Sequence, residues 1–240
     1  MSVVSLIDHA VLQPTQTDAH LRVACEMCKR VGAASVCVKP SMVPLTAELL
    51  AGSSVVPSTV IGFPHGGTST GAKVRETEIA VAEGAREVDM VVNLGRVLAE
   101  DWSFVEVDIR AVVEAARAGD AITKVIFETG LLPTDELKIR LCEVSERAGA
   151  AFVKTSTGFG MIKGDGGAMY STGATDHDIA LMRAHVSDAV QVKASGGIRS
   201  LADAQRFVAL GATRLGTSGT EAIAAAEAGE DPGASSGGAY

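Results

Sequence analysis

Short apolar runs rich in β-branched residues alternate with amphipathic stretches along almost the whole chain. Nearly continuous apolar runs are typical of parallel strands that are covered on both faces, and the stretches between them have helical periodicity. The expected strands, the third with its loop, are residues 5–10, 35–40, 58–66, 87–93, 123–130, 151–158, 190–197 and 213–218. The expected helices are residues 18–31, 41–50, 71–83, 102–118, 134–148, 175–184, 200–210 and a last one that ends near 226. Eight strand–helix repeats predict a single-domain α/β fold, the (β/α)8 TIM barrel, with a doubly wound open sheet as the main alternative.

The sequence predicts one folded domain with a short tail, and its charge argues against nucleic acid and membrane partners. We expect a barrel domain over residues 1–227 and a flexible Gly/Ser-rich tail over residues 228–240 that ends in Tyr240. The net charge of −8 offers no basic face to a nucleic acid or to an anionic membrane. The N-terminal residues lack the basic region of a signal peptide, and no apolar run reaches the length of a membrane span. We therefore expect a cytoplasmic protein.

The four cysteines and five histidines give no pattern of a metal site. Cys25 and Cys28 form a C-x-x-C, but this motif lies in a helical stretch without a second ligand pair, so free thiols are the preferred interpretation. The histidines show no metal-ligand spacing. We expect neither a metal nor a cofactor.

Two lysines follow strand-like runs in similar contexts, Lys154 in FVKTSTG and Lys193 in VKASGG. A second ammonium ~6 Å away at an effective dielectric of ~20 contributes ~2.8 kcal/mol, which lowers a lysine pKa by about two units, and partial burial adds to this. A neutral lysine of this kind is the nucleophile of imine-forming enzymes. Taken singly, each lysine also fits a structural role in which its stem reaches solvent and its ammonium pairs with a carboxylate.

Asp89 lies inside the apolar run VDMVV, where a carboxylate needs a partner. It can transfer protons beside an imine, or it can form a structural ion pair, and the sequence favours neither.

Glycine-rich loops follow the seventh and eighth expected strands, at 195–200 (SGGIRS) and 216–220 (GTSGT). Glycines let backbone N–H groups approach an anion at a helix start, and phosphate sites recur at this place in barrels. The segment 158–167 fits neither a dinucleotide fingerprint nor a P-loop, so nucleotide binding is not expected.

These residues closely resemble the deoxyribose-phosphate aldolase family. The matching segments are FVKTSTGF, VKASGGIR, EVDMVVN, GFPHG, KVIFETG and the opening LIDH followed by LQPT, in colinear order from about Leu6 to Ser218. The resemblance implies a class I aldolase that reversibly cleaves 2-deoxy-D-ribose 5-phosphate to D-glyceraldehyde 3-phosphate and acetaldehyde through a lysine Schiff base.

The resemblance also implies roles for individual residues. Lys154 matches the Schiff-base lysine, Lys193 the second lysine that perturbs it, and Asp89 the aspartate that relays protons. The positions that match the substrate-binding residues of the family are Asp8, Cys37, Thr157, Gly158, Gly196, Gly197, Gly216 and Ser218. In members that end in tyrosine the tail can reach the site, which would give Tyr240 a role. The expected partners are a phosphorylated sugar, aldehydes and, for a homodimer, a second copy.

Three positions depart from the family pattern: Ala10 where openings often have threonine, Gly219 in place of a second serine, and Phe159 where some members have lysine. With Ala10 we expect a missing hydrogen bond to the substrate hydroxyls, and with Gly219 one phosphate contact from the backbone alone. With Phe159 we expect somewhat weaker phosphate binding and greater tolerance of unphosphorylated aldehydes. Two kinds of alternative remain. One is another imine-forming barrel, such as a transaldolase or a keto-acid aldolase. The other is an inactive protein that only binds a sugar phosphate.

Overall fold

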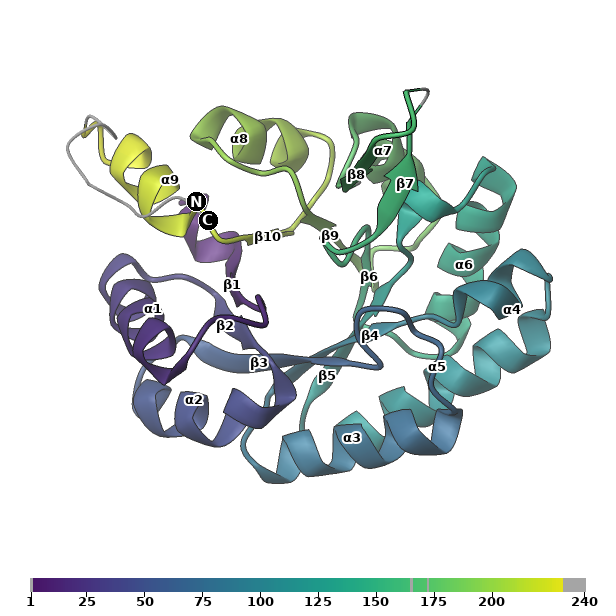
Figure 1. Ribbon diagram of the computed structural model, residues 1–240, viewed down its shortest axis with the longest axis horizontal. Helices are drawn as coiled ribbons and strands as arrows, with labels where there is room; N and C mark the ends of the chain where they lie inside the picture. Colours follow the sequence, from purple (N-terminus) through teal and green to yellow (C-terminus); the bar gives the residue numbers. More distant parts are fainter. Residues whose placement is uncertain (1, 165, 172, 231–240) are drawn as a thin grey trace.

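Eight parallel strands form a closed barrel in the order β1-β10-β9-β6-β5-β4-β3-β2, surrounded by helices (Figure 1). This architecture comes from a computed structural model that describes residues 2–164, 166–171 and 173–230. The barrel strands are β1 (Ile7–Val11), β2 (Ser35–Val38), β3 (Val56–Ile61), β4 (Glu87–Val91), β5 (Ile122–Ile126), β6 (Phe152–Lys154), β9 (Gln191–Ser195) and β10 (Arg214–Thr217). The closed ring confirms the predicted TIM barrel and excludes the open-sheet alternative.

Helices follow the strands in sequence and cover the outside of the barrel (Figure 1). They are α1 (Asp18–Val31), α2 (Val43–Leu50), α3 (Thr70–Ala82), α4 (Leu94–Leu98), α5 (Trp102–Arg117), α6 (Asp135–Arg147), α7 (Asp176–Ala184), α8 (Leu201–Ala209) and α9 (Thr220–Glu227). Short 3₁₀ turns occur at Val4–Leu6, Pro40–Met42 and Thr129–Leu131. The expected helices therefore form close to their predicted bounds.

Alternation along β4 and β9 separates an apolar outer face from an inner face that carries charged side chains. In β4, Val88 and Met90 belong to the hydrophobic core, whereas Asp89 between them does not. In β9, Val192 and Ala194 belong to that core on either side of Lys193. The core thus lies between the strands and the helices, and the charged side chains point into the barrel.

The glycine-rich segment after β6 forms two strands where the sequence pattern predicted none. It contains a two-stranded antiparallel sheet of β7 (Met161–Lys163) and β8 (Met169–Ser171), which is separate from the barrel. Both strands have three residues and are largely exposed, so no apolar period marks them in the sequence. Residues 231–240, including Tyr240, lie outside the described residues.

No helix within residues 2–164, 166–171 and 173–230 is long and apolar enough to cross a membrane.

Candidate active site

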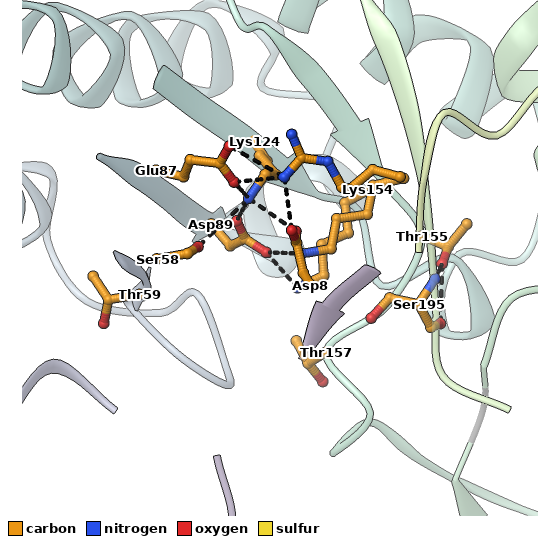
Figure 2. Close-up of polar contacts among 12 residues, drawn as sticks. Asp8, Ser58, Thr59, Glu87, Asp89, Lys124, Lys154, Thr155, Thr157 and Ser195 are labelled. Carbon is orange, nitrogen blue, oxygen red and sulfur yellow. Dashed lines mark hydrogen bonds and ion pairs between the residues drawn. The ribbon is translucent and has the colours of Figure 1, made fainter. Parts of the chain in front are cut away.

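Four basic and three acidic side chains form one connected network of ion pairs inside the barrel. They come from six of the strands, namely β1, β4, β5, β6, β9 and β10. The basic members are Lys124, Lys154, Lys193 and Arg214, and the acidic members are Asp8, Glu87 and Asp89. Figure 2 shows the dashed contacts that connect them.

Lys154 and Lys193 lie side by side, as the sequence argument requires. They are register partners on the neighbouring strands β6 and β9. The Nζ atoms of both donate to the same oxygen of Asp89, Oδ2, at 2.8 Å for Lys154 and 2.7 Å for Lys193. Both lysines are buried, at 2% and 1% exposure, so neither reaches solvent along its stem.

Lys124 is a third buried lysine that the sequence analysis did not identify. Its Nζ lies 2.8 Å from Asp89 Oδ1, 3.1 Å from Asp8 Oδ2 and 2.6 Å from Glu87 Oε2. Arg214 lies 2.7 Å from Asp8 and 2.8 Å from Glu87. The signal for Lys124 is its place inside the apolar run TKVIF, where it alternates with Thr123 and Val125 as Asp89 does with its own neighbours.

The distribution of carboxylates singles out Lys154 among the basic groups. Its ammonium has one carboxylate partner in the network, whereas Lys193 has two and Lys124 has three. With four bases and three acids, loss of one proton makes the network neutral, and the least compensated base loses it at the lowest electrostatic cost.

The pKa shifts follow this distribution. Burial lowers the pKa of Lys154, Asp89 opposes this, and the ammonium of Lys193 adds to the lowering. Burial acts in the same direction on Lys193, but Asp8 and Asp89 outweigh it and raise the pKa of that lysine. The sequence argument attributed most of the lowering of the Lys154 pKa to the neighbouring ammonium. In the structure, burial is the larger cause of that lowering.

Asp89 forms ion pairs, as the structural interpretation of this residue predicted. Burial alone would raise the pKa of its carboxyl, but Lys124, Lys154 and Lys193 outweigh burial and lower it below the ordinary value. In this state the carboxylate is fully charged and holds ammonium groups, so the proton relay stays a prediction.

A cavity of about 460 Å³ opens over the two adjacent lysines. Every predicted catalytic or substrate-binding residue within the described chain lines it except Asp89, which lies beneath the lysines. The lining members of that set are Asp8, Cys37, Thr157, Gly158, Gly196, Gly197, Gly216, Ser218, Lys154 and Lys193. The Cys37 thiol is buried there, and burial raises its pKa, so it is a protonated wall group and not a nucleophile.

Backbone groups on one side of this cavity suit an anion. Among the described residues, the N–H groups of Gly158, Gly197 and Ser218 donate no hydrogen bond. Unpaired N–H groups from neighbouring loops form a concave site for a phosphate. The absence of a side chain at Gly216 lets the backbone of β10 lie close to Ser195 and Lys193. A Cβ at this position would lie 2.5 Å from Ser195 Oγ and 3.2 Å from Lys193 Cε.

The three departures from the family pattern lie at this end of the barrel. Ala10 and Phe159 line the cavity, and Gly219 is the residue before α9. A larger groove of about 1000 Å³ adjoins the cavity at Ala10, Gln16 and Ser218, but none of the buried lysines lines it. The lysines therefore place the chemistry in the smaller cavity.

The described part of the chain holds no group of three or more His, Cys, Asp or Glu side chains arranged for a metal ion. Cys25 and Cys28 are free and buried on α1. Burial raises their pKa values to about 11 and about 12.

Comparisons with known proteins agree with this geometry. A sequence profile described as DeoC/LacD family aldolase matches residues 2–237. A deoxyribose-phosphate aldolase from Bacillus cytotoxicus is 50% identical over 223 residues, which cover 93% of this chain and 95% of the relative. One from Listeria welshimeri is 46% identical over 227 residues, 95% of this chain and 96% of the relative.

A solved structure gives the same result. The deoxyribose phosphate aldolase from Aeropyrum pernix, described as a unique tetramer, superposes with a TM-score of 0.82 at 30% identity and covers 92% of this chain and 89% of that one. The chain belongs to the DeoC/LacD family of aldolases.

Proposed function

We propose that this protein is a deoxyribose-phosphate aldolase that cleaves 2-deoxy-D-ribose 5-phosphate to D-glyceraldehyde 3-phosphate and acetaldehyde, and catalyses the reverse reaction. The observation that carries the proposal is Lys154 itself, a buried lysine with a lowered pKa that lines a cavity together with N–H groups for which the described residues offer no acceptor. Its near relatives bear the same name and match nearly their whole length.

The reaction begins when the neutral Nζ of Lys154 attacks C1 of the open-chain sugar. Loss of water gives a protonated imine on that nitrogen. The C3 hydroxyl then loses its proton, the C2–C3 bond breaks, and its electron pair moves into the imine to give an enamine. Glyceraldehyde 3-phosphate leaves, the enamine is protonated at C2, and hydrolysis releases acetaldehyde and free Lys154.

The charged neighbours of Lys154 support the charge changes in this sequence. The Asp89 carboxylate lies 2.8 Å from the nitrogen on which the positive imine forms, so it stabilises that charge. Lys193 has a raised pKa and remains an ammonium, which can supply a proton to a departing or forming group. We assign the proton transfers to Lys193, Asp89 and water together.

The remaining substrate contacts are part of the same proposal. The phosphate binds against Gly158, Gly196, Gly197, Gly216 and Ser218, and Asp8, Cys37 and Thr157 line the rest of the cavity. The tail is proposed to contribute Tyr240, and removal of that one residue is expected to lower kcat/KM for the phosphorylated sugar. We also propose that the protein works in the cytoplasm as an oligomer of identical chains, as the tetrameric relative suggests; sedimentation of the pure chain as a monomer would contradict this.

Borohydride trapping with acetaldehyde tests the chemistry and the residue together. Reduction of the imine should add one ethyl group to the chain, and peptide mapping should locate it on Lys154. The Lys154→Ala variant should take up none, and stoichiometric labelling of that variant would refute the assignment. A screen with keto acids and ketose phosphates separates the other imine-forming barrels. A chain that binds sugar phosphate without any label would be the inactive binding protein.

A further inference from the structure

Glu128 is a buried carboxylate near the cavity that the proposed reaction does not use. It follows β5, is 1% exposed, and adopts a left-handed backbone conformation with φ of 54°, which is unfavourable for a residue with a side chain. Burial raises the pKa of its carboxyl. A charged group in such a conformation is retained only where the surroundings hold it firmly.

Thr157 supplies the hydrogen bonds to this carboxylate. Its backbone N–H lies 3.3 Å from Oε1 and 3.2 Å from Oε2 of Glu128, and its hydroxyl donates to Oε2. The same hydroxyl accepts from the N–H groups of Phe159 at 2.9 Å and Gly160 at 3.2 Å. One carboxylate therefore fixes the hydroxyl, and the hydroxyl fixes the next turn of backbone.

The backbone of this turn is wrapped closely around the carboxylate. A Cβ on Gly160 would lie 2.7 Å from the Glu128 carboxyl carbon, so no other residue fits there without a shift of the carboxylate. Gly158 has a φ of 83°, its N–H is among those without a partner in the described chain, and it lines the cavity with Thr157 and Phe159. Glu128 itself does not line the cavity.

We propose that Glu128 is a positioning residue that sets the shape of the loop 157–160 and through it governs binding of the phosphate-bearing end of the substrate. This role rests on the proposed function and deepens it. Glu128 acts on substrate binding through the loop, whereas Lys154 and Lys193 act on the carbon–carbon bond that breaks. Glu128 acts without contact to the substrate, because it does not line the cavity.

The Glu128→Gln variant tests the role with almost no change in volume. The N–H and the hydroxyl of Thr157 both donate to Oε2, and the N–H also reaches Oε1, whereas a glutamine amide has one acceptor oxygen and no charge. The N–H then loses its second acceptor and the remaining hydrogen bonds are no longer charge-assisted, so the loop is held less firmly while the packing is kept. Thr157→Val, which removes the hydroxyl, should have the same effect from the other side.

The decisive readout is the separation of KM from kcat for two substrates. In Glu128→Gln we expect KM for 2-deoxyribose 5-phosphate to rise at least tenfold. We expect kcat for that substrate, kcat/KM for unphosphorylated 2-deoxyribose and the yield of trapped acetaldehyde to change less than twofold. Asp178→Asn is the control, since it also neutralises a buried carboxylate that accepts from a threonine hydroxyl, but one on α7 that pairs with Lys138 and does not line the cavity. It should leave both KM values unchanged.

An unchanged KM for the phosphorylated sugar in Glu128→Gln, or an equal loss of kcat/KM for both substrates, would overturn the proposed role. These outcomes differ from failure of the aldolase assignment, in which the wild-type chain itself would neither cleave the sugar nor take up the borohydride label.

Discussion

At the scale of single residues, Phe159 is an apolar side chain beside a proposed phosphate site. Its ring packs edge-on against Phe63, with centroids 5.3 Å apart and planes at 82°, and it lines the cavity. In Phe159→Lys we expect the ratio of kcat/KM for phosphorylated to unphosphorylated 2-deoxyribose to rise about tenfold, because a charge-assisted hydrogen bond to phosphate contributes roughly 1.5–3 kcal/mol. Phe159→Leu is the uncharged control, and an unchanged ratio in the lysine variant would contradict the effect.

The lowered pKa of Lys154 predicts how imine formation depends on pH. Only the neutral amine attacks a carbonyl, so the rate of borohydride trapping should rise with pH and level off around a midpoint below 10.5, the ordinary value for lysine. The ammonium of Lys193 adds to the lowering, so Lys193→Met should move the midpoint to higher pH. Lys29→Met, which removes a lysine paired with Glu26 on α1, should leave the midpoint in place. A midpoint that moves down in Lys193→Met would show that the two ammonium groups are not coupled in this way.

At the scale of elements, a second buried ion pair fastens α3 to α5 and to the end of β4. Lys73 Nζ lies 2.6 Å from Asp108 and donates to the carbonyl oxygen of Val91 at 2.9 Å, and the Thr70 hydroxyl donates to the same aspartate at 2.7 Å. Both charged side chains are almost fully buried, at 0% and 2% side-chain exposure.

Loss of Lys73 alone leaves the Asp108 carboxylate buried without its counter-charge. We expect Lys73→Met to lower the free energy of unfolding by about 3–5 kcal/mol in urea titrations, and the double variant with Asp108→Leu to recover part of this loss. Arg75→Met is the comparison on the same helix, since it breaks an exposed pair with Glu78 and should cost less than about 1 kcal/mol. If the double variant were less stable than Lys73→Met alone, the unpaired Asp108 carboxylate would not be the cause of the lost stability.

The strands and helices of the barrel could be predicted from the sequence because each combines an apolar run with turn residues at its ends. The hairpin of β7 and β8 could not, since its strands have only three residues each, are largely exposed and show no periodic pattern. Lys154 and Lys193 were identified because glycine-rich loops follow them directly. Lys124, Glu87 and Arg214 were missed because no glycine-rich loop follows them: Lys124 lies in the middle of β5, and the other two are the first residues of β4 and β10. Only the strand order shows that they meet. Glu128 gains its role from Thr157, twenty-nine positions away, which no local pattern reveals.

At the scale of the whole molecule, the ionic network replaces the branched apolar layers that usually fill the middle of such a barrel. Its members come from both ends of the sequence, because Asp8 on β1 binds Arg214 on β10 across the closure of the barrel. The same carboxylate also contacts Lys124 and Lys193. The charge of each group therefore depends on strands far from it in sequence, and the lowered pKa of Lys154 is a property of the closed ring.

The count of four bases against three acids makes a prediction about Lys124, which shares the carboxylate of Asp89 with Lys154. Lys124 binds Asp89 through Oδ1 and Lys154 binds it through Oδ2. In Lys124→Met three bases face three acids, so a protonated Lys154 now balances the network and Asp89 binds it more strongly. We expect the midpoint of the trapping profile to move to higher pH, with slower imine formation at neutral pH. Lys73→Met is the matched control, since it also removes a fully buried lysine and lowers stability, but from a pair outside the network. If both variants shifted the midpoint equally, the shift would reflect lost stability, and the charge balance across the barrel would not explain the reactivity of Lys154.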